Sequence, residues 1–145
     1  MDHISKLTCI DDCELDHFIL TKTLSRFGSP YEVKCSSTGA AVLYLLSQYR
    51  LNKEKLPDII LIDIYTKELD AWGFLDELQS LYSKLVKPIE VYILSAFVYP
   101  DDLERLREYR FIQSVIIKPI TREILCELIR QKESANRFMI LENPN

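Results

Sequence analysis

The sequence has few of the residues that build structural zinc sites and disulfide frameworks. Among 145 residues there are four cysteines and two histidines, and no two cysteines form a C-x-x-C pair. Zinc-binding and disulfide-stapled domains depend on such closely spaced ligands. We therefore interpret the cysteines as small buried hydrophobic residues of a protein from a reducing compartment.

Long apolar runs and an excess of basic charge are also missing. No run approaches the ~20 apolar residues that span a bilayer, and the N-terminus lacks the pattern of a secretory signal. The formal net charge is −4, with acidic and basic residues interspersed, so no basic stripe indicates a nucleic-acid surface. We expect a soluble cytoplasmic protein that binds neither membranes nor nucleic acid.

Hydrophobic residues make up 48% of the chain, which is enough for the core of one domain. Short apolar and β-branched runs alternate with stretches in which apolar residues recur every three to four positions. This alternation predicts βα units, and hence a parallel sheet covered by helices on both faces. The runs expected as strands are 7–10, 31–35, 59–62, 89–94 and 114–117.

The stretches between these runs carry the marks of amphipathic helices. The first is expected to bury the apolar residues of one stripe. Three of the other expected helices are preceded by residues that favour a helix N-terminus. These residues are a serine pair, a proline followed by carboxylates, and a threonine. The stripe of the first helix is Leu15, Ile19, Leu20, Leu24 and Phe27, and the start signals are Ser36 or Ser37, Pro100 and Thr121.

Polar residues directly follow four of the five expected strands. They are Asp11 and Asp12, Asp63, Ser95 and Lys118. In a doubly wound sheet of order 2-1-3-4-5 the first and third strands are neighbours, so these side chains would meet at one sheet edge. We therefore predict an α/β, flavodoxin-like (βα)5 fold with a five-stranded parallel sheet in the order 2-1-3-4-5.

Three carboxylates at one place repel one another unless a cation neutralises them. Mg²⁺ fits best, because it takes a few carboxylates together with water and phosphate oxygens. We expect Asp12 and Asp63 to be direct ligands and Asp11 to act through a water molecule. The backbone carbonyl of Tyr65, two residues beyond Asp63, would complete the shell.

A carboxylate can also act as a nucleophile and form an aspartyl phosphate. Asp63 is the best candidate, because it ends the central strand. Lys118 would place its charge on one phosphoryl oxygen, and the Ser95 hydroxyl would donate a hydrogen bond to another. The residue types together predict a divalent-metal and phosphoryl site.

With these residues, the chain resembles the receiver domains of two-component response regulators, the CheY-like family. The matching segments are Cys9–Asp12, Leu61–Ile64, Ile93–Ala96 and Ile117–Ile120. The resemblance implies a receiver domain over residues 1–135 and a tail over 136–145, with no output domain. It also implies a cis bond between Lys118 and Pro119.

The resemblance further implies phosphorelay signal transduction by a stand-alone phosphoprotein. Asp63 would accept a phosphoryl group from a sensor histidine kinase or a histidine phosphotransfer protein. Asp11 and Asp12 would hold Mg²⁺, while Ser95 and Lys118 would sense the phosphoryl group. The output would be contact with a downstream protein target, so the chain would be no enzyme beyond an intrinsic autodephosphorylation.

Some positions depart from the family pattern. The loop after the phosphoacceptor has Lys67 in place of a proline, and Asp70-Ala71 in place of Asp-Gly. Val115 stands where an aromatic switch residue is common. A switch would then depend mainly on Ser95 and the loop that follows it.

Two aromatic residues, Tyr65 and Phe97, are expected beside the phosphoryl group. Either they restrict the access of hydrolytic water and prolong the phosphorylated state, or they merely pack against the loop. The tail, with its apolar residues 138–141, is expected to be disordered, the other outcomes being an extended last helix or docking on a partner.

Two other functions remain as alternatives. One is a receiver-like binding module that is never phosphorylated. The other is a haloacid-dehalogenase-type phosphatase, which also uses an aspartyl nucleophile. Phosphatases of that class have a second aspartate two residues after the nucleophilic aspartate, and Tyr65 occupies this position here.

Overall fold

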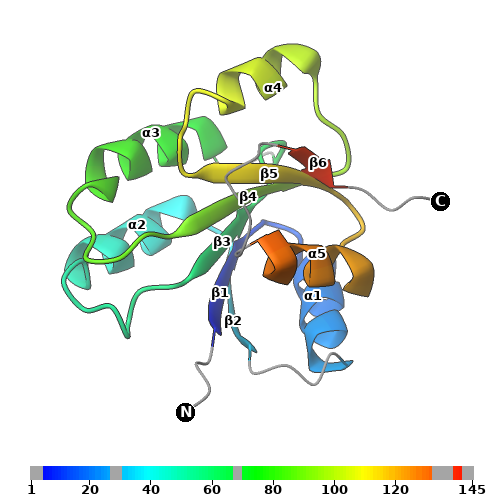
Figure 1. Ribbon diagram of the computed structural model, residues 1–145, viewed down its shortest axis with the longest axis horizontal. Helices are drawn as coiled ribbons and strands as arrows, with labels where there is room; N and C mark the ends of the chain where they lie inside the picture. The colour runs from blue at the N-terminus through cyan, green and yellow to red at the C-terminus, as the bar shows by residue number, and fades with distance from the viewer. Residues whose placement is uncertain (1–4, 27–30, 67–69, 132–138, 142–145) are drawn as a thin grey trace.

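The computed structural model describes residues 5–26, 31–66, 70–131 and 139–141. They form one parallel sheet with helices on both faces (Figure 1). The strands are β1 (Ser5–Ile10), β2 (Tyr31–Ser36), β3 (Ile59–Ile62), β4 (Glu90–Ser95), β5 (Ile112–Ile117) and β6 (Met139–Leu141). The helices are α1 (Glu14–Arg26), α2 (Gly39–Gln48), α3 (Ala71–Tyr82), α4 (Pro100–Leu106) and α5 (Arg122–Gln131).

The central strands β3 and β4 are buried on both faces, which explains why they are nearly continuous apolar runs, whereas the edge strand β2 exposes Glu32, Lys34 and Cys35. Along β3, Ile60 and Ile62 belong to the core beneath α2, α3 and α4, while Ile59 and Leu61 belong to the core beneath α1 and α5. Figure 1 shows these helices on the two sides of the sheet. Burial of each such side chain contributes about 1.5–3 kcal/mol.

The predicted strand order 2-1-3-4-5 is confirmed, but the sheet has a sixth strand. Met139–Leu141 pairs in parallel with Ser114–Ile116 and extends the order to β2-β1-β3-β4-β5-β6. The expectation of a disordered tail is therefore wrong for these residues, and the rest of 136–145 lies outside the described residues. The added strand pairs backbone groups along an edge of β5 that would otherwise face solvent.

The first helix buries fewer residues than predicted. Leu20 and Leu24 are buried, but Leu15 and Ile19 are 64% and 37% exposed. Ile19 directly precedes Leu20, so it is turned by about 100° around the helix and away from the sheet. Phe27 lies outside the described residues.

The helix starts are partly as predicted. Pro100 begins α4, and Thr121 accepts a hydrogen bond from the Ile124 amide at the start of α5. The prediction of a serine cap for α2 is wrong. Thr38 is the cap there, with its hydroxyl accepting from the Ala41 amide, while the Ser36 hydroxyl donates to the Thr38 carbonyl.

Cysteine burial is also only partly as expected. Cys9 is buried, but Cys35 is exposed, and Cys9, Cys13 and Cys35 are free thiols.

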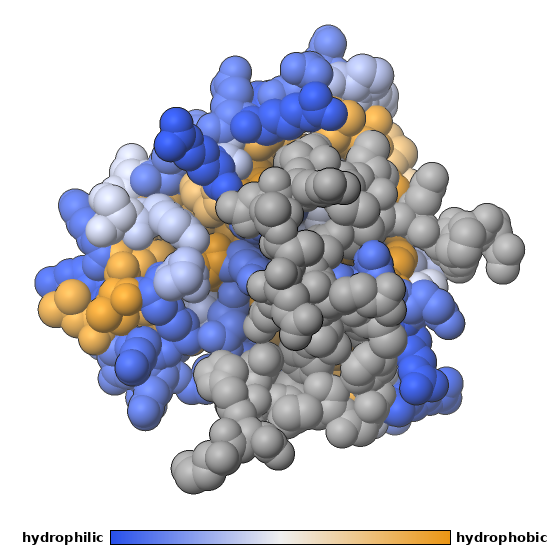
Figure 2. All heavy atoms as spheres, in the orientation of Figure 1, coloured by the Kyte–Doolittle hydropathy of each residue, from blue (hydrophilic) through white to orange (hydrophobic). Residues whose placement is uncertain are grey.

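Around α4, hydrophilic residues lie on the outside with hydrophobic residues beneath them (Figure 2). Within the described residues, no helix is both long and apolar enough to cross a bilayer.

Candidate functional site

The candidate site is held in place by backbone hydrogen bonds that continue the sheet beyond its strands. The Asp63 amide donates to the Ile10 carbonyl at 3.1 Å, and the Lys118 amide donates to the Ser95 carbonyl at 2.8 Å. Adjacent parallel strands therefore carry these residues to the same edge, as predicted. Asp11, Asp63 and Ser95 are all buried.

The Lys118 ammonium lies at the centre of an acidic cluster, which we define as Asp11, Asp16 and Asp63. Its Nζ atom donates to Asp63 Oδ2 at 2.6 Å, to Asp16 Oδ2 at 2.5 Å and to Asp11 Oδ2 at 3.0 Å. An ammonium has three donors, and here each has a carboxylate acceptor. Three carboxylates thus share one positive charge.

Burial and charge pairing set the protonation of this cluster. Burial alone would lower the pKa of Lys118, but its hydrogen bonds to Asp16, Asp63 and Asp11 outweigh burial and raise that pKa above the ordinary range. Burial raises the pKa of Asp11, although Lys118 and the Cys13 amide oppose this. For Asp16, pairing with Lys118 outweighs burial and lowers the pKa. Lys118 is therefore charged at neutral pH.

Asp16 is the member of the cluster that sequence reasoning missed. It lies in the first turn of α1, the helix that follows the Asp11-Asp12 loop. The first turn of a helix after β1 borders the same sheet edge, and this placement could have suggested it. Asp12, the predicted direct metal ligand, is exposed and outside the cluster, so its role stays a prediction.

The donor set of the cluster fits a hard divalent cation. Carboxylate oxygens of Asp11, Asp16 and Asp63 lie within 4.8 Å of one another. Such oxygens are the ligands that Mg²⁺ prefers, and the single ammonium leaves an excess of negative charge for it to offset. The Tyr65 amide donates to Asp63 Oδ1 at 2.8 Å, while the predicted use of the Tyr65 carbonyl as a ligand remains a prediction.

The positions that depart from the expected pattern have structural explanations where they are described. Val115 is buried in the core, so no aromatic ring occupies that place. Asp70 caps α3 by accepting from the Gly73 amide at 2.9 Å, and a Cβ atom at Gly73 would collide with this carboxylate. The Lys118–Pro119 bond is cis, as predicted, and Lys67 lies outside the described residues.

Three aromatic rings from the loops after β3 and β4 pack together, and we call Tyr65, Phe97 and Tyr99 the aromatic cluster. Tyr65 stacks on Phe97 with ring centroids 4.9 Å apart, and Tyr99 meets both rings edge-on, at 5.5 and 5.1 Å. The rings therefore pack on one another. Their effect on hydrolytic water stays a prediction.

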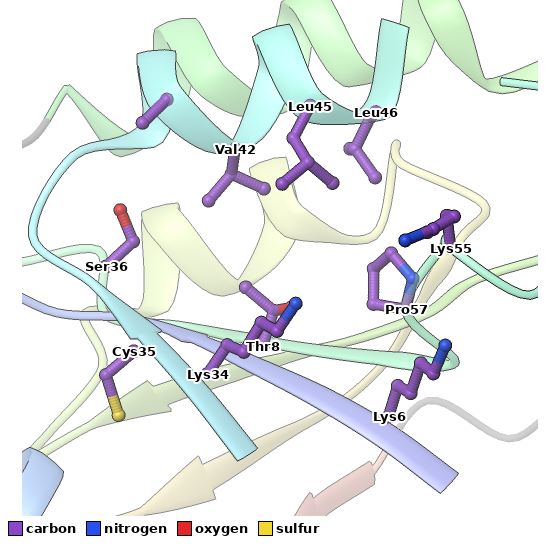
Figure 3. Close-up of a pocket in the computed structure, with 11 residues that line it drawn as sticks. Lys6, Thr8, Lys34, Cys35, Ser36, Val42, Leu45, Leu46, Lys55 and Pro57 are labelled. Atoms are coloured by element: carbon purple, nitrogen blue, oxygen red, sulfur yellow. The ribbon is translucent and has the colours of Figure 1, made fainter. Parts of the chain in front are cut away.

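Of the cavities in the described part of the chain, one lies away from the acidic cluster and another borders it. One, of about 190 Å³, lies between α2 and the strands β1 and β2, with Val42, Leu45 and Leu46 above it and Lys6 and Lys34 below (Figure 3). It contains none of the acidic cluster. The other, also about 190 Å³, borders the site and is lined by Asp16, Ile19, Leu94, Lys118, Pro119 and Ile120.

Comparison with solved structures identifies the architecture. A two-component response regulator from Cytophaga hutchinsonii aligns with a TM-score of 0.77 at 21% identity, over 90% of this chain and 97% of the other. The chain has the receiver fold of response regulators. No family model matches the sequence, and no curated protein does.

Other receiver structures align over a similar share of the chain. A two-component response regulator from Legionella pneumophila has a TM-score of 0.72 at 25% identity, over 90% of this chain and 99% of that one. The receiver domain of a sensor histidine kinase from Pseudomonas aeruginosa has a TM-score of 0.68 at 17% identity, over 89% and 97% of the two chains. That structure has a magnesium ion coordinated in its active-site cleft.

Proposed function

We propose that this protein is a phosphoacceptor switch of a two-component system, with Asp63 as the residue that is phosphorylated. The observation that carries the proposal is the position of Asp63 in the receiver fold. Its carboxylate is buried at the end of β3, 2.6 Å from the Lys118 ammonium. A buried nucleophile beside a fixed cation suits transfer of an anionic phosphoryl group.

The proposed reaction transfers a phosphoryl group from a phosphohistidine. An Asp63 oxygen forms the new bond to phosphorus while the phosphorus–nitrogen bond breaks, and the imidazole keeps the electron pair and takes up a proton. Lys118, which stays protonated, pairs with a phosphoryl oxygen. The Tyr65 amide holds Asp63 Oδ1 at 2.8 Å and so fixes the orientation of the nucleophile. The Ser95 hydroxyl, at the end of β4, donates to another phosphoryl oxygen.

The site would hold Mg²⁺ through Asp11, Asp12, Asp63 and the Tyr65 carbonyl, with Asp16 also within reach. Bound Mg²⁺ supplies positive charge that offsets the carboxylates and the phosphoryl oxygens. The magnesium ion in the Pseudomonas aeruginosa receiver domain supports this choice of metal. The acidic cluster, which carries three carboxylates against one ammonium, supports it independently.

The proposed partners are a sensor histidine kinase or a phosphotransfer protein, and a downstream protein target. Exposed apolar residues support a protein partner, because Leu15 and Phe18 are 64% and 58% exposed on the helix that carries Asp16. We place the protein in the cytoplasm with the kinases of such systems. The receiver domain spans 1–135, and Met139–Leu141 of the tail join its sheet.

Two other functions are less consistent with the site. A haloacid-dehalogenase-type phosphatase would need an acid two residues after the nucleophile, and Tyr65 stands there with its hydroxyl bonded to Asp102. A binding module that is never phosphorylated would have no need of a buried acidic cluster around Lys118. Burying such charges is costly, so their presence favours a chemical role.

The proposal is tested by intact mass after incubation with acetyl phosphate and Mg²⁺. We expect one phosphoryl adduct on the wild-type protein, none on Asp63→Asn, and none after chelation of the metal. Failure of the wild-type protein to form an adduct with acetyl phosphate, phosphoramidate or a phosphorylated phosphotransfer protein would contradict the proposal.

A further inference from the structure

Three side-chain contacts join α4 and the residues that follow it to α3 and to the loop after β3. The Arg105 guanidinium lies 4.0 Å from the centre of the Trp72 ring, and the Tyr109 hydroxyl donates to Asp76 at 2.5 Å. The third is made by Tyr65, whose hydroxyl donates to Asp102 in the first turn of α4. Of these three attachments, the one through Tyr65 also reaches Asp63.

Tyr65 is bonded at both ends. Its amide donates to Asp63 Oδ1 at 2.8 Å, while its hydroxyl donates to Asp102 and accepts from the Tyr99 amide at 3.0 Å. A phenol hydroxyl is protonated at neutral pH, so that of Tyr65 can donate. One residue thus connects the candidate phosphoacceptor with the start of α4.

The start of α4 is held by a few tertiary contacts, among them the packing of Val98 and Leu103 against the core. Its cap residue, Tyr99, makes no side-chain capping bond, and the helix has only seven residues, of which Leu106 at the far end is buried. Helices this short depend on tertiary contacts for their stability. The Tyr65 hydroxyl supplies such a contact to both Tyr99 and Asp102, and the stacked rings of the aromatic cluster reinforce it.

We propose that Asp102 is a positioning residue, which acts through the Tyr65 hydroxyl to set the loop after Asp63 and to transmit a change at Asp63 to the first turn of α4. This inference rests on the proposed phosphorylation of Asp63. A new group on Asp63 changes what the Tyr65 amide can donate to. Tyr65 then shifts, and the first turn of α4 follows its hydroxyl. Val115 offers no ring for such coupling, so the path runs through the aromatic cluster instead.

The test uses two variants that cut the path and one matched control. Tyr65→Phe keeps the ring and the amide but loses the hydroxyl, and Asp102→Ala removes the acceptor. Asp101→Ala is the control, because Asp101 is exposed and lies in the same helical turn. Amide ¹H–¹⁵N chemical shifts are recorded with and without acetyl phosphate and Mg²⁺, at the site (63–66) and in α4 (Pro100–Leu106, proline excepted).

In the wild-type protein and Asp101→Ala, we expect amide shifts to change at the site and in α4. In Tyr65→Phe and Asp102→Ala, the site should still respond, while the α4 response should fall to less than half. The response of the site also shows that each variant is folded.

A full α4 response in Tyr65→Phe or Asp102→Ala would overturn the inference alone. An equal loss in Asp101→Ala would also overturn it, since the effect would then not depend on the Tyr65 bond. A wild-type protein that shows no response at the site would overturn the proposed function and this inference together.

Discussion

The Lys118 ammonium lies 2.5 Å from Asp16 Oδ2, a separation no longer than the 2.6 Å to Asp63 Oδ2. Asp16 comes from a helix, whereas Asp11, Asp63 and Lys118 follow strands. The cation at the candidate site is therefore divided between the nucleophile and a carboxylate of α1. Asp63 therefore shares the charge of Lys118 with two other carboxylates. One positive charge against three carboxylates leaves the cluster with an excess of negative charge.

Asp16→Asn should weaken Mg²⁺ binding by about tenfold, or ~1.4 kcal/mol. The substitution removes one of three carboxylates whose oxygens lie within 4.8 Å of one another, and so lowers the negative charge that attracts the metal. Calorimetric titration of the unphosphorylated protein measures this. Glu14→Gln is the matched control, since Glu14 is exposed in the same turn of α1 and lies outside the cluster. Equal Mg²⁺ affinity in Asp16→Asn and wild type would refute the prediction.

Lys118→Met should lower the free energy of unfolding by about 2 kcal/mol without metal, less than for a fully buried pair because Asp16 is 26% exposed. Three carboxylates would then lose their shared counterion, and added Mg²⁺ should restore most of the loss. Urea unfolding with and without Mg²⁺ provides the measurement. Lys34→Met is the control, because the Lys34 side chain is 71% exposed and its pair with Glu32 is loose at 3.9 Å. If Lys118→Met were as stable as wild type without metal, Lys118 would not be the stabilising counterion of the three carboxylates.

Tyr65→Asn should speed the loss of the phosphoryl group by about tenfold, or ~1.4 kcal/mol in the barrier. The stacked Tyr65 and Phe97 rings would no longer restrict water beside Asp63. Decay of the phosphoprotein after removal of the donor is followed by intact mass. Tyr65→Phe keeps the ring and should decay at a rate much closer to wild type than that of Tyr65→Asn, which separates shielding by the ring from the role of the hydroxyl. If the phosphoryl group were lost from Tyr65→Asn at the wild-type rate, the Tyr65 ring would not restrict water and would serve only to pack against the loop.

Alkaline pH should destabilise the protein partly through Tyr109. Burial, and then the hydrogen bond to Asp76, raise its pKa from 10.0 to about 12. A folded-state pKa above the unfolded value means that the stabilisation is complete below pH 10 and is lost as the pH rises through about 12. In urea unfolding between pH 9 and pH 12, Tyr109→Phe should lose less stability than wild type. An identical loss in both proteins would show that Tyr109 does not contribute.

Much of the fold follows from local patterns in the sequence. The apolar runs at β3 and β4 are nearly continuous because both faces of the sheet are buried there, and polar residues mark where these strands end. Strand order could be inferred because Asp11 and Asp63 have a common role only if β1 and β3 are neighbours. The three-residue strand β6 could not be predicted, since its pairing with Ser114–Ile116 depends on a free edge that only the assembled sheet provides.

The parts of the site that follow strands were predictable, and those that depend on helix rotation were not. Asp11, Asp63, Ser95 and Lys118 directly follow apolar runs, so their common edge could be inferred. The place of Asp16 in the first turn of α1 could have suggested that it lies near this edge, but its contact with Lys118 depends on how α1 is rotated against the sheet. The Tyr65–Asp102 bond joins residues 37 positions apart, through the β4–α4 loop, and no local pattern signals it.

The central claim is that Asp63 carries the phosphoryl group, and borohydride trapping tests it most directly. Wild-type protein is treated with acetyl phosphate and Mg²⁺, reduced with borohydride, digested and sequenced by mass spectrometry, with Asp63→Asn as the control. An aspartyl phosphate is reduced to homoserine, so the account predicts homoserine at position 63 of the wild-type protein and at no other aspartate. Homoserine at Asp11, Asp12 or Asp16 instead, or a phosphorylated protein with an unmodified Asp63, would contradict it.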